Sequence, residues 1–399
     1  MLMLYCATIC STLLGLLASI VNTRFLQPSD YGDVRYVQNI IYFLGSILLF
    51  GYFWSGSRLL ALSKNEQKSR QIRGAMILIL IFCFILMEIA VFVCFLIHLN
   101  TPYLANLFLL SMLVCAYPLI SSYIETTAQG DNHIGKLSAA RILPYAFYIP
   151  IAYLLYSSTG ATSSKMILLQ WGIYSTVFVL IVILTRPSFK NIKSNFNKLN
   201  IENKKYGLQL YFGSLAMIAT NYLAGISLGA FNDDNINVGF YTLSLTITTP
   251  LSLLPGIIGT TYFKEFATLD KIPTKVFKAT VVITGLSCLL FILLIQPVVT
   301  FFYSETYSKV GIYSCVMSVG FSVHGIGDMI NRYLGSHGQG ISIRNSSFIC
   351  GAFRIVGFSL LVYLWDINGA LLTNILSSFA YCLVLIYYYR KYVNTGRTS

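Results

Sequence analysis

The stretch RPSFKNIKSNFNKLNIENKK, residues 186–205, is the longest polar segment of this chain, and long apolar regions lie on both sides of it. Of the 399 residues, 56% are hydrophobic and only 10% are charged, and the mean hydropathy is +0.70. Soluble domains contain about 25% charged residues. A water-soluble fold could not bury so much apolar surface, so the sequence predicts an all-α protein that crosses a membrane many times.

The apolar regions divide into segments that are each long enough to cross a bilayer as a helix of about 20 residues. No short strand-like alternation appears, which argues against a membrane barrel. The first segment lacks a basic start and a small-residue cleavage site, so we interpret it as a span and not as a signal peptide. The twelve predicted spans are Leu2–Asn22, Tyr36–Ser57, Gly74–His98, Tyr103–Ile124, Ser138–Ser158, Met166–Thr185, Tyr206–Phe231, Val238–Phe263, Phe277–Phe302, Val310–Asn331, Ile343–Leu364 and Ile367–Tyr389.

This order predicts an N-terminal six-helix bundle over residues 1–185, a basic cytoplasmic linker over 186–205, and a C-terminal six-helix bundle with a short basic tail over 206–399. The two halves also share a faint pattern, in which Leu26–Gly32 corresponds to Leu228–Tyr241. Because each half has an even number of spans, the repeat is parallel, with its axis along the membrane normal.

The basic residues predict the orientation. With the N-terminus placed inside, the inner loops and tail hold 22 of the 27 lysines and arginines, including Lys64 and Arg397. The outer loops hold four, namely Arg24, Arg35, Lys165 and Lys309, and Arg354 lies within a span. Short cytoplasmic loops are enriched in lysine and arginine, so both termini should be cytoplasmic. The same rule accounts for the net charge of +13 without invoking nucleic acid.

The segment RFLQPSDYG, residues 24–32, directly follows the first span. Pro28 should end that helix, Ser29 or Asp30 should cap the next one, and Gly32 should allow a tight turn. Arg24 then lies at the outer end of the first span. It either anchors the helix at the interface or faces the phosphates of a substrate, because a guanidinium binds phosphate oxygens in pairs.

Several ionisable residues fall inside predicted spans, where they are costly and therefore point to pairing or function. Glu88 is near the middle of the third span and suggests either a coupling ion or a buried ion pair. His324 and Asp328 lie towards the cytoplasmic end of the tenth span, and Arg332 directly follows it. The three recur every four residues and so share one helix face, which serves ion coupling or a buried ion pair, or is simply solvated or salt-bridged. Arg354 lies almost at the midpoint of the eleventh span, beside Gly351, Ala352 and Gly357. It requires either a salt bridge to Glu88 or Asp328, or a water-filled cavity that holds an anionic head group.

No pattern for catalysis or for a cofactor is present in the sequence. The chain has no nucleophile-turn motif, no phosphate-binding loop and no metalloprotease motif, so it is not expected to be an enzyme or to hydrolyse ATP by itself. Its nine cysteines all lie in apolar segments without CxxC spacing, and neither a disulfide nor a metal site is expected.

Three stretches resemble a known family: NTRFLQPSDYGDVRYVQNI at residues 22–40, FGYFWSGSRLLA at 50–61, and NVGFYTLSLTITTPLSLLPGIIGTTYFKEFA at 237–267. They look like the Wzx-type polysaccharide or O-antigen flippases of the multidrug/oligosaccharidyl-lipid/polysaccharide exporter superfamily. An arginine at the place of Arg24, before L-x-P-x-x-Y-G, is typical of that family. Its members usually carry further polar residues before the first span, whereas the apolar run begins here at Leu2.

The resemblance implies a V-shaped pair of six-helix bundles around a central cavity, working by alternating access in the bacterial inner membrane. The implied substrate is an undecaprenyl-pyrophosphate-linked oligosaccharide of the O-antigen or capsule type, and the resemblance favours Arg24 as a residue that contacts its pyrophosphate. Arg354 is the second candidate for this contact, because of its position within a span. The implied partners are this lipid-linked oligosaccharide, membrane lipids, a proton or sodium ion for coupling, and a polysaccharide polymerase with its chain-length regulator.

Two other functions remain open at this point. A cation-coupled drug or metabolite exporter of the related antiporter branch would have a smaller and more acidic cavity, which the net charge of +13 disfavours. A scaffold for glycosyltransferases would not need two six-helix halves. An oligosaccharide polymerase would need one large outer loop, and every predicted outer loop is short.

Overall fold

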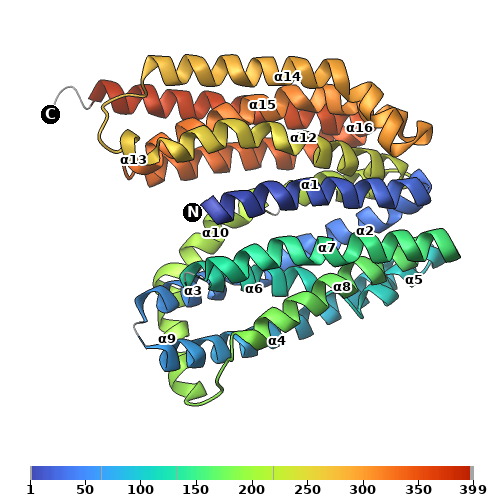
Figure 1. Cartoon of the computed structure of the whole chain (residues 1–399), viewed down its shortest axis with the longest axis horizontal. Helices are drawn as coiled ribbons and strands as arrows, with labels where there is room; N and C mark the ends of the chain where they lie inside the picture. The colour runs from blue at the N-terminus through green and yellow to red at the C-terminus, as the bar shows by residue number, and fades with distance from the viewer. Residues whose placement is uncertain (1, 64, 132, 219, 396–399) are drawn as a thin grey trace. The chain divides into compact units, whose positions relative to one another are not determined.

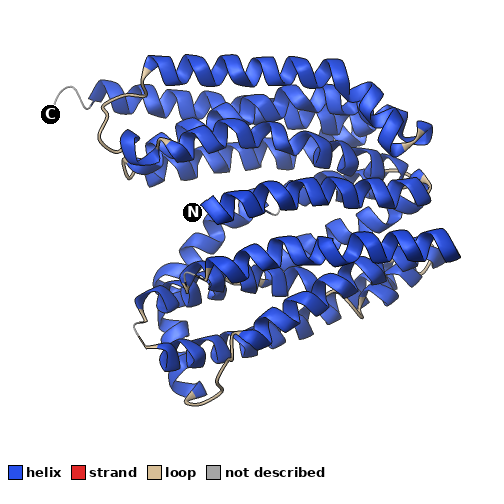
Figure 2. Cartoon of the chain, viewed as in Figure 1, coloured by secondary structure: helices blue, strands red, loops and turns tan. Residues whose placement is uncertain are grey.

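The computed structural model describes residues 2–63, 65–131, 133–218 and 220–395. Helices make up nearly all of this part of the chain, and no strand occurs within it (Figure 1, Figure 2). Lys64 and Arg397, which were counted with the inner basic residues, lie outside the described residues. The chain divides into two compact units, Met1–Tyr222 and Leu223–Ser399.

The first unit contains ten helices, a π-helical turn and the start of α11. Its helices are α1 (Leu2–Phe25), α2 (Pro28–Leu48), α3 (Tyr52–Leu62), α4 (Glu66–Ile97), α5 (Pro102–Ser111), α6 (Tyr117–Gly130), α7 (Ile134–Thr159), α8 (Ser163–Leu184), α9 (Ile192–Glu202), η1 (Asn203–Gly207) and α10 (Leu208–Ile218). Helix α7 packs against α1 and α8, and α3 packs against α6.

The second unit is built around α15, which packs along α12, α14 and α16. Its elements are α11 (Thr220–Phe231), which begins in the first unit, α12 (Ile236–Thr261), α13 (Phe263–Phe266), α14 (Thr274–Tyr303), η2 (Glu305–Tyr307), α15 (Ser308–Ser336) and α16 (Gly340–Thr395).

Each of the twelve predicted spans coincides with one helix, a pair of helices or half of α16. Eight helices in the described part of the chain are long and apolar enough to cross a membrane, and α2 with α3 forms a further span bent by 57°. The all-α architecture with many spans is therefore confirmed. The predicted linker at residues 186–205 is largely helical and contains α9.

The bend between α2 and α3 depends on backbone geometry that favours glycine. Phe50 and Gly51 both have positive φ angles, 46° and 79°. A side chain at Gly51 would also collide with the backbone of Gly207. Gly51 therefore allows both the left-handed turn and the close approach of η1.

The break inside α16 lies where the eleventh span was predicted to end. Trp365 and Asp366 have non-helical dihedral angles, and φ of Asp366 is 49°. The carboxylate of Asp366 accepts hydrogen bonds from Asn232, at 2.8 Å, and from Asn237. These two amides hold the strained residue in place, so the polar corner joins the two halves of α16 to the start of α12.

The predicted cap of the second helix is wrong, and so is the turn at Gly32. The helix α2 begins at Pro28, with Gln27 as an extended N-cap residue that makes no side-chain capping bond. Proline suits the first helical position because its fixed φ is helical and its missing N–H has no partner there. The helix therefore starts eight residues before the predicted Tyr36 and takes in Arg35.

Candidate functional site

Arg35 lies on α2 inside the bent span, about two turns after the helix begins. Its placement in an outer loop was therefore wrong. Its Nη1 donates a hydrogen bond to Gln38 Oε1 at 2.8 Å, and Gln38 Nε2 donates to Gln170 Oε1 on α8 at 3.1 Å. The guanidinium Cζ lies 4.8 Å from the centroid of the Tyr31 ring. These contacts join the cation to two helices of the first unit.

Tyrosines from its own helix and from two other helices surround this cation. The charge of Arg35 acts on Tyr42 of α2, on Tyr145 and Tyr148 of α7, and on Tyr174 of α8. Tyr148 donates a hydrogen bond of 2.5 Å to Asn22 Oδ1 of α1. The neighbours of Arg35 are thus mainly aromatic, and the charge of Glu125 also acts on Tyr145.

The aromatic rings form a continuous cluster in the first unit. Tyr42 packs edge-on against Trp171, with centroids 5.5 Å apart, and stacks on Tyr222 at 5.2 Å. Tyr117 contacts Tyr42, Trp171 and Tyr174 at 5.3–6.1 Å. Trp171 is only 1% exposed, whereas Tyr42 and Tyr117 are half-buried. The half-buried rings keep surface available for a ligand.

Arg35 has no acidic partner in the part of the chain that the structure describes. No carboxylate oxygen in this part lies within 4.0 Å of its guanidinium, and its Nε is buried without a hydrogen-bond acceptor. Removing a cation from water without a counter-ion is costly. An anion bound beside Arg35 would offset this cost, so we take Arg35 and its aromatic neighbours as the candidate site of the first unit.

In the second unit, Arg354 lies about midway between the start of α16 at Gly340 and the break at Trp365. It is half-buried, and its charge acts on Tyr241, His324 and Asp328. A side chain at the nearby Gly357 would collide with Thr373. That glycine therefore makes room for the second half of α16.

The structure brings His324 and Asp328 together on one tyrosine. The rings of His324 and Tyr381 are stacked, with centroids 4.5 Å apart, and the Tyr381 hydroxyl donates to Asp328 Oδ1 at 3.0 Å. Asn331 donates to the same hydroxyl at 2.7 Å. Arg332 is exposed, and Asp328 has no cation within 4.0 Å among the described residues.

The two remaining predicted site residues lie in the first unit. Arg24 is exposed in the last turn of α1. Glu88 is half-buried in α4, and its Oε1 accepts a hydrogen bond from the Cys115 thiol at 3.3 Å.

Arg73, which the sequence placed among the inner loop cations, lies in α4 and is a further buried charge. Arg73 is 1% exposed, and its Nε donates to Asp131 Oδ2 at 2.6 Å. Its Nη1 donates to Glu66 Oε1 at 3.0 Å and to the carbonyl of Thr185 at 2.7 Å. Glu66 and Arg73 are seven residues apart and therefore lie on one face of α4, which was a signal in the sequence for this pair. Arg73 thus joins α4 to the ends of α6 and α8.

The sequence and the fold of this chain are similar to those of known proteins. Residues 1–263 match the family described as polysaccharide biosynthesis protein. The chain belongs to this family. The match covers the whole first unit and extends through α12, and it confirms the resemblance recognised in the sequence.

Solved structures show the same fold over almost the whole chain. A MATE family multidrug resistance transporter of the MOP superfamily, in an inward-facing conformation, is 13% identical with a TM-score of 0.70, covering 98% of this chain and 96% of its own. The lipid II flippase MurJ in an inward closed conformation is 14% identical with a TM-score of 0.74, covering 98% and 88%.

A third solved structure, the MATE multidrug transporter DinF-BH, is 12% identical with a TM-score of 0.68, covering 97% and 95%. No curated protein sequence matches the chain. The protein is thus a multi-pass membrane protein with the fold of the MOP superfamily.

Proposed function

We propose that this protein is a flippase that carries a lipid-linked oligosaccharide, joined to its polyprenyl carrier through pyrophosphate, across the bacterial inner membrane by alternating access. The O-antigen or capsule-type repeat unit is the proposed cargo. Family membership supports a role in polysaccharide biosynthesis. The lipid II flippase MurJ, which shares the fold, supports the transport of a lipid-linked substrate.

The setting of Arg35 is the observation that carries this proposal. Its guanidinium lies in a span, has no carboxylate within 4.0 Å among the described residues, and stands among tyrosines. Arginine is well suited to phosphate oxygens because its N–H groups form a planar fork. A cationic drug would be repelled at this site, so Arg35 favours the flippase over the drug exporter.

Arg24 and Arg354 are the further cations that we propose for the head group. We propose that four further residues serve ion coupling or form buried ion pairs. They are Glu88, His324, Asp328 and Arg332. On the proposed orientation, both termini and the basic stretch at residues 186–205 face the cytoplasm. The polymerase and the chain-length regulator are the proposed protein partners.

The test is genetic and chemical. Deletion of the gene should cause lipid-linked oligosaccharide to accumulate in the cytoplasmic leaflet, with loss of surface polysaccharide, and the wild-type gene should restore both. The lipid-linked pool is measured by mass spectrometry and its leaflet by access of an impermeant glycan-modifying enzyme. Normal surface glycan with altered drug resistance would overturn the proposal in favour of the exporter.

A further inference from the structure

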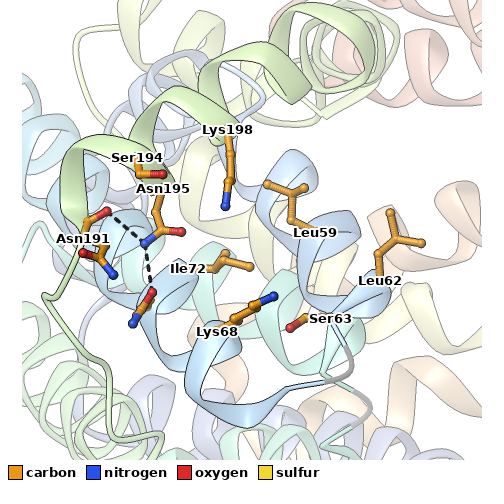
Figure 3. A pocket seen from close by; sticks show the side chains of 10 residues that line it. Leu59, Leu62, Ser63, Lys68, Ile72, Asn191, Ser194, Asn195 and Lys198 are labelled. Carbon is orange, nitrogen blue, oxygen red and sulfur yellow. Dashed lines mark hydrogen bonds between the residues drawn. The ribbon is translucent and has the colours of Figure 1, made fainter.

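A pocket of about 430 Å³ lies on the first unit, and Arg35 is not among the residues that line it (Figure 3). Small-molecule sites commonly enclose about 300–1,000 Å³, so it is large enough for a ligand. The end of α3, the first turns of α4, and α9 form its walls. Its lining residues are Leu59, Leu62, Ser63, Lys68, Gln71, Ile72, Asn191, Ser194, Asn195 and Lys198.

Hydrogen bonds hold the walls of this pocket together. Asn195 is only 6% exposed, and its Nδ2 donates to the carbonyl of Asn191 at 3.0 Å and to Gln71 Oε1 on α4 at 3.4 Å. Both bonds are drawn in Figure 3. The hydroxyl of Tyr52 donates to Asn200 Oδ1 at 2.9 Å, which anchors the other end of α9 to α3.

An ion pair adds a second tie between α9 and α3. Arg58 Nη1 lies 2.5 Å from Glu202 Oε1, and its Cζ lies 4.8 Å from the Tyr206 ring centroid. The pocket is therefore formed by packed helices that are joined to one another at several points, which makes it a built surface feature.

The polar part of the pocket is positively charged. Lys198 extends from α9 and Lys68 from α4 into the region between the helices (Figure 3). No aspartate or glutamate lines the pocket, and neither lysine has a carboxylate within 4.0 Å in the described part of the chain. Two unpaired amines beside a serine hydroxyl and amide groups provide hydrogen-bond donors for phosphate oxygens.

The other part of the pocket is apolar. Leu62 is 67% exposed, and it lies beside Leu59 and the nearly buried Ile72. Further exposed apolar side chains, Phe196 and Ile201, lie on α9. The long apolar segment of α4 begins at Gly74, less than a turn after Ile72. The pocket therefore lies at the N-terminal end of a candidate span, with amines and aliphatic side chains among its lining residues.

We propose that this pocket binds the head group of an anionic membrane phospholipid. The phosphodiester would lie between Lys68 and Lys198, and the glycerol with the first carbons of the acyl chains would lie against Leu59 and Leu62. Lysine and arginine side chains near a membrane surface are attracted to the negatively charged head groups of anionic lipids. Free phosphate would leave the apolar wall unused. A bound lipid would bridge α9 to α3 and α4, and so would hold the basic stretch against the first unit.

The test uses the full-length protein in neutral detergent, with lipid binding measured by native mass spectrometry. Phosphatidylglycerol should bind, and phosphatidylcholine should bind at least about tenfold more weakly. Lys68→Gln/Lys198→Gln should weaken phosphatidylglycerol binding about tenfold or more. Lys68→Arg/Lys198→Arg should retain it, which separates loss of charge from loss of the fold.

The matched control is Lys193→Gln/Lys204→Gln. It removes the same number of positive charges as the pocket variant, at two exposed positions of the basic stretch that do not line the pocket. Equal weakening in the control and in the pocket variant would overturn the proposal, because the attraction would then be general. Displacement of the lipid by millimolar inorganic phosphate would overturn it in favour of a free-anion site. Failure of the proposed export function would leave this lipid measurement unaffected.

Discussion

Arg35 and Tyr31 lie one helical turn apart on α2, with the guanidinium Cζ 4.8 Å from the centre of the tyrosine ring. The ring face stabilises the cation without neutralising it. A guanidinium has five N–H donors, and the structure engages one of them on Gln38. The charge of Arg35 is therefore not balanced by a carboxylate within 4.0 Å among the described residues, as the proposed binding of an anion requires.

The first prediction follows from that arrangement. Arg35→Gln should keep a hydrogen bond to the amide neighbours but should lose export by about 10- to 100-fold, the value of one or two charge-assisted hydrogen bonds. Arg35→Lys should restore only part of the activity, because an ammonium lacks the planar fork. Surface polysaccharide in a complemented deletion strain gives the readout, normalised to the amount of protein in the membrane.

Arg344→Gln is the matched control for this experiment. It removes one positive charge from an exposed position near the start of α16. It should leave export unchanged. Full activity of Arg35→Gln, or equal loss in both variants, would show that Arg35 does not contact the substrate.

The second prediction concerns stability. Arg73→Ala should destabilise the protein by about 3–5 kcal/mol, because Asp131 would be left buried without its cation. The Asp131 side chain is 6% exposed and bonds to Arg73 at 2.6 Å. The apparent Tm of the purified protein should fall strongly. Arg70→Ala, three residues earlier on α4, removes a half-buried arginine whose acceptor is the carbonyl of Arg186, and it should cost much less. Equal Tm values for the two variants would contradict this role of Arg73.

The third prediction tests the proposed orientation. In a background without the native cysteines, an impermeant maleimide should label Asp233→Cys from outside intact cells and should miss Ser194→Cys. Both positions are exposed, one in the short loop before α12 and the other on α9. Permeabilised cells should show labelling at both. The reverse pattern in intact cells would invert the topology, and the basic stretch would then face outward.

The sequence predicted the helices well because the crossing of a bilayer is recorded locally, as about 20 apolar residues in a row. The break in α16 at Trp365 and Asp366 was also readable, because a polar residue interrupts the apolar run there. The bend between α2 and α3 could not be predicted from the sequence. Its turn at Phe50 and Gly51 lies inside a continuous apolar segment and depends on the approach of Gly207.

The site residues were harder to predict because charge patterns along a chain do not show burial. Arg35 and Arg73 were predicted to lie in loops, yet both lie in helices. The carboxylate nearest to Arg73 in space belongs to Asp131, which is 58 residues away in the sequence. The shared face of His324 and Asp328 was visible from their spacing. Their contact with Tyr381 could not be predicted, because Tyr381 lies 53 residues after Asp328 in another helical segment.

The last prediction concerns Arg354, whose charge acts on Asp328 although Asp328 takes its hydrogen bond from Tyr381. If Arg354 serves a substrate head group, Arg354→Gln should insert and fold normally and should lose export by about 10- to 100-fold. If its purpose is to balance Asp328, the same variant should lower the amount of folded protein, and Asp328→Asn should restore it in the double variant. We expect the first result, because the carboxylate of Asp328 is already held by a hydroxyl donor.

Fluorescence-detected size-exclusion chromatography measures the amount of folded protein, and surface polysaccharide measures export. The two measurements therefore distinguish a loss of folding from a loss of transport. Tyr381→Phe is the companion variant, since it removes the hydroxyl that bonds to Asp328 while keeping the ring stacked on His324. It should lower stability without the large loss of export expected for Arg354→Gln. A stable and fully active Arg354→Gln protein would exclude both roles for the charge of this arginine.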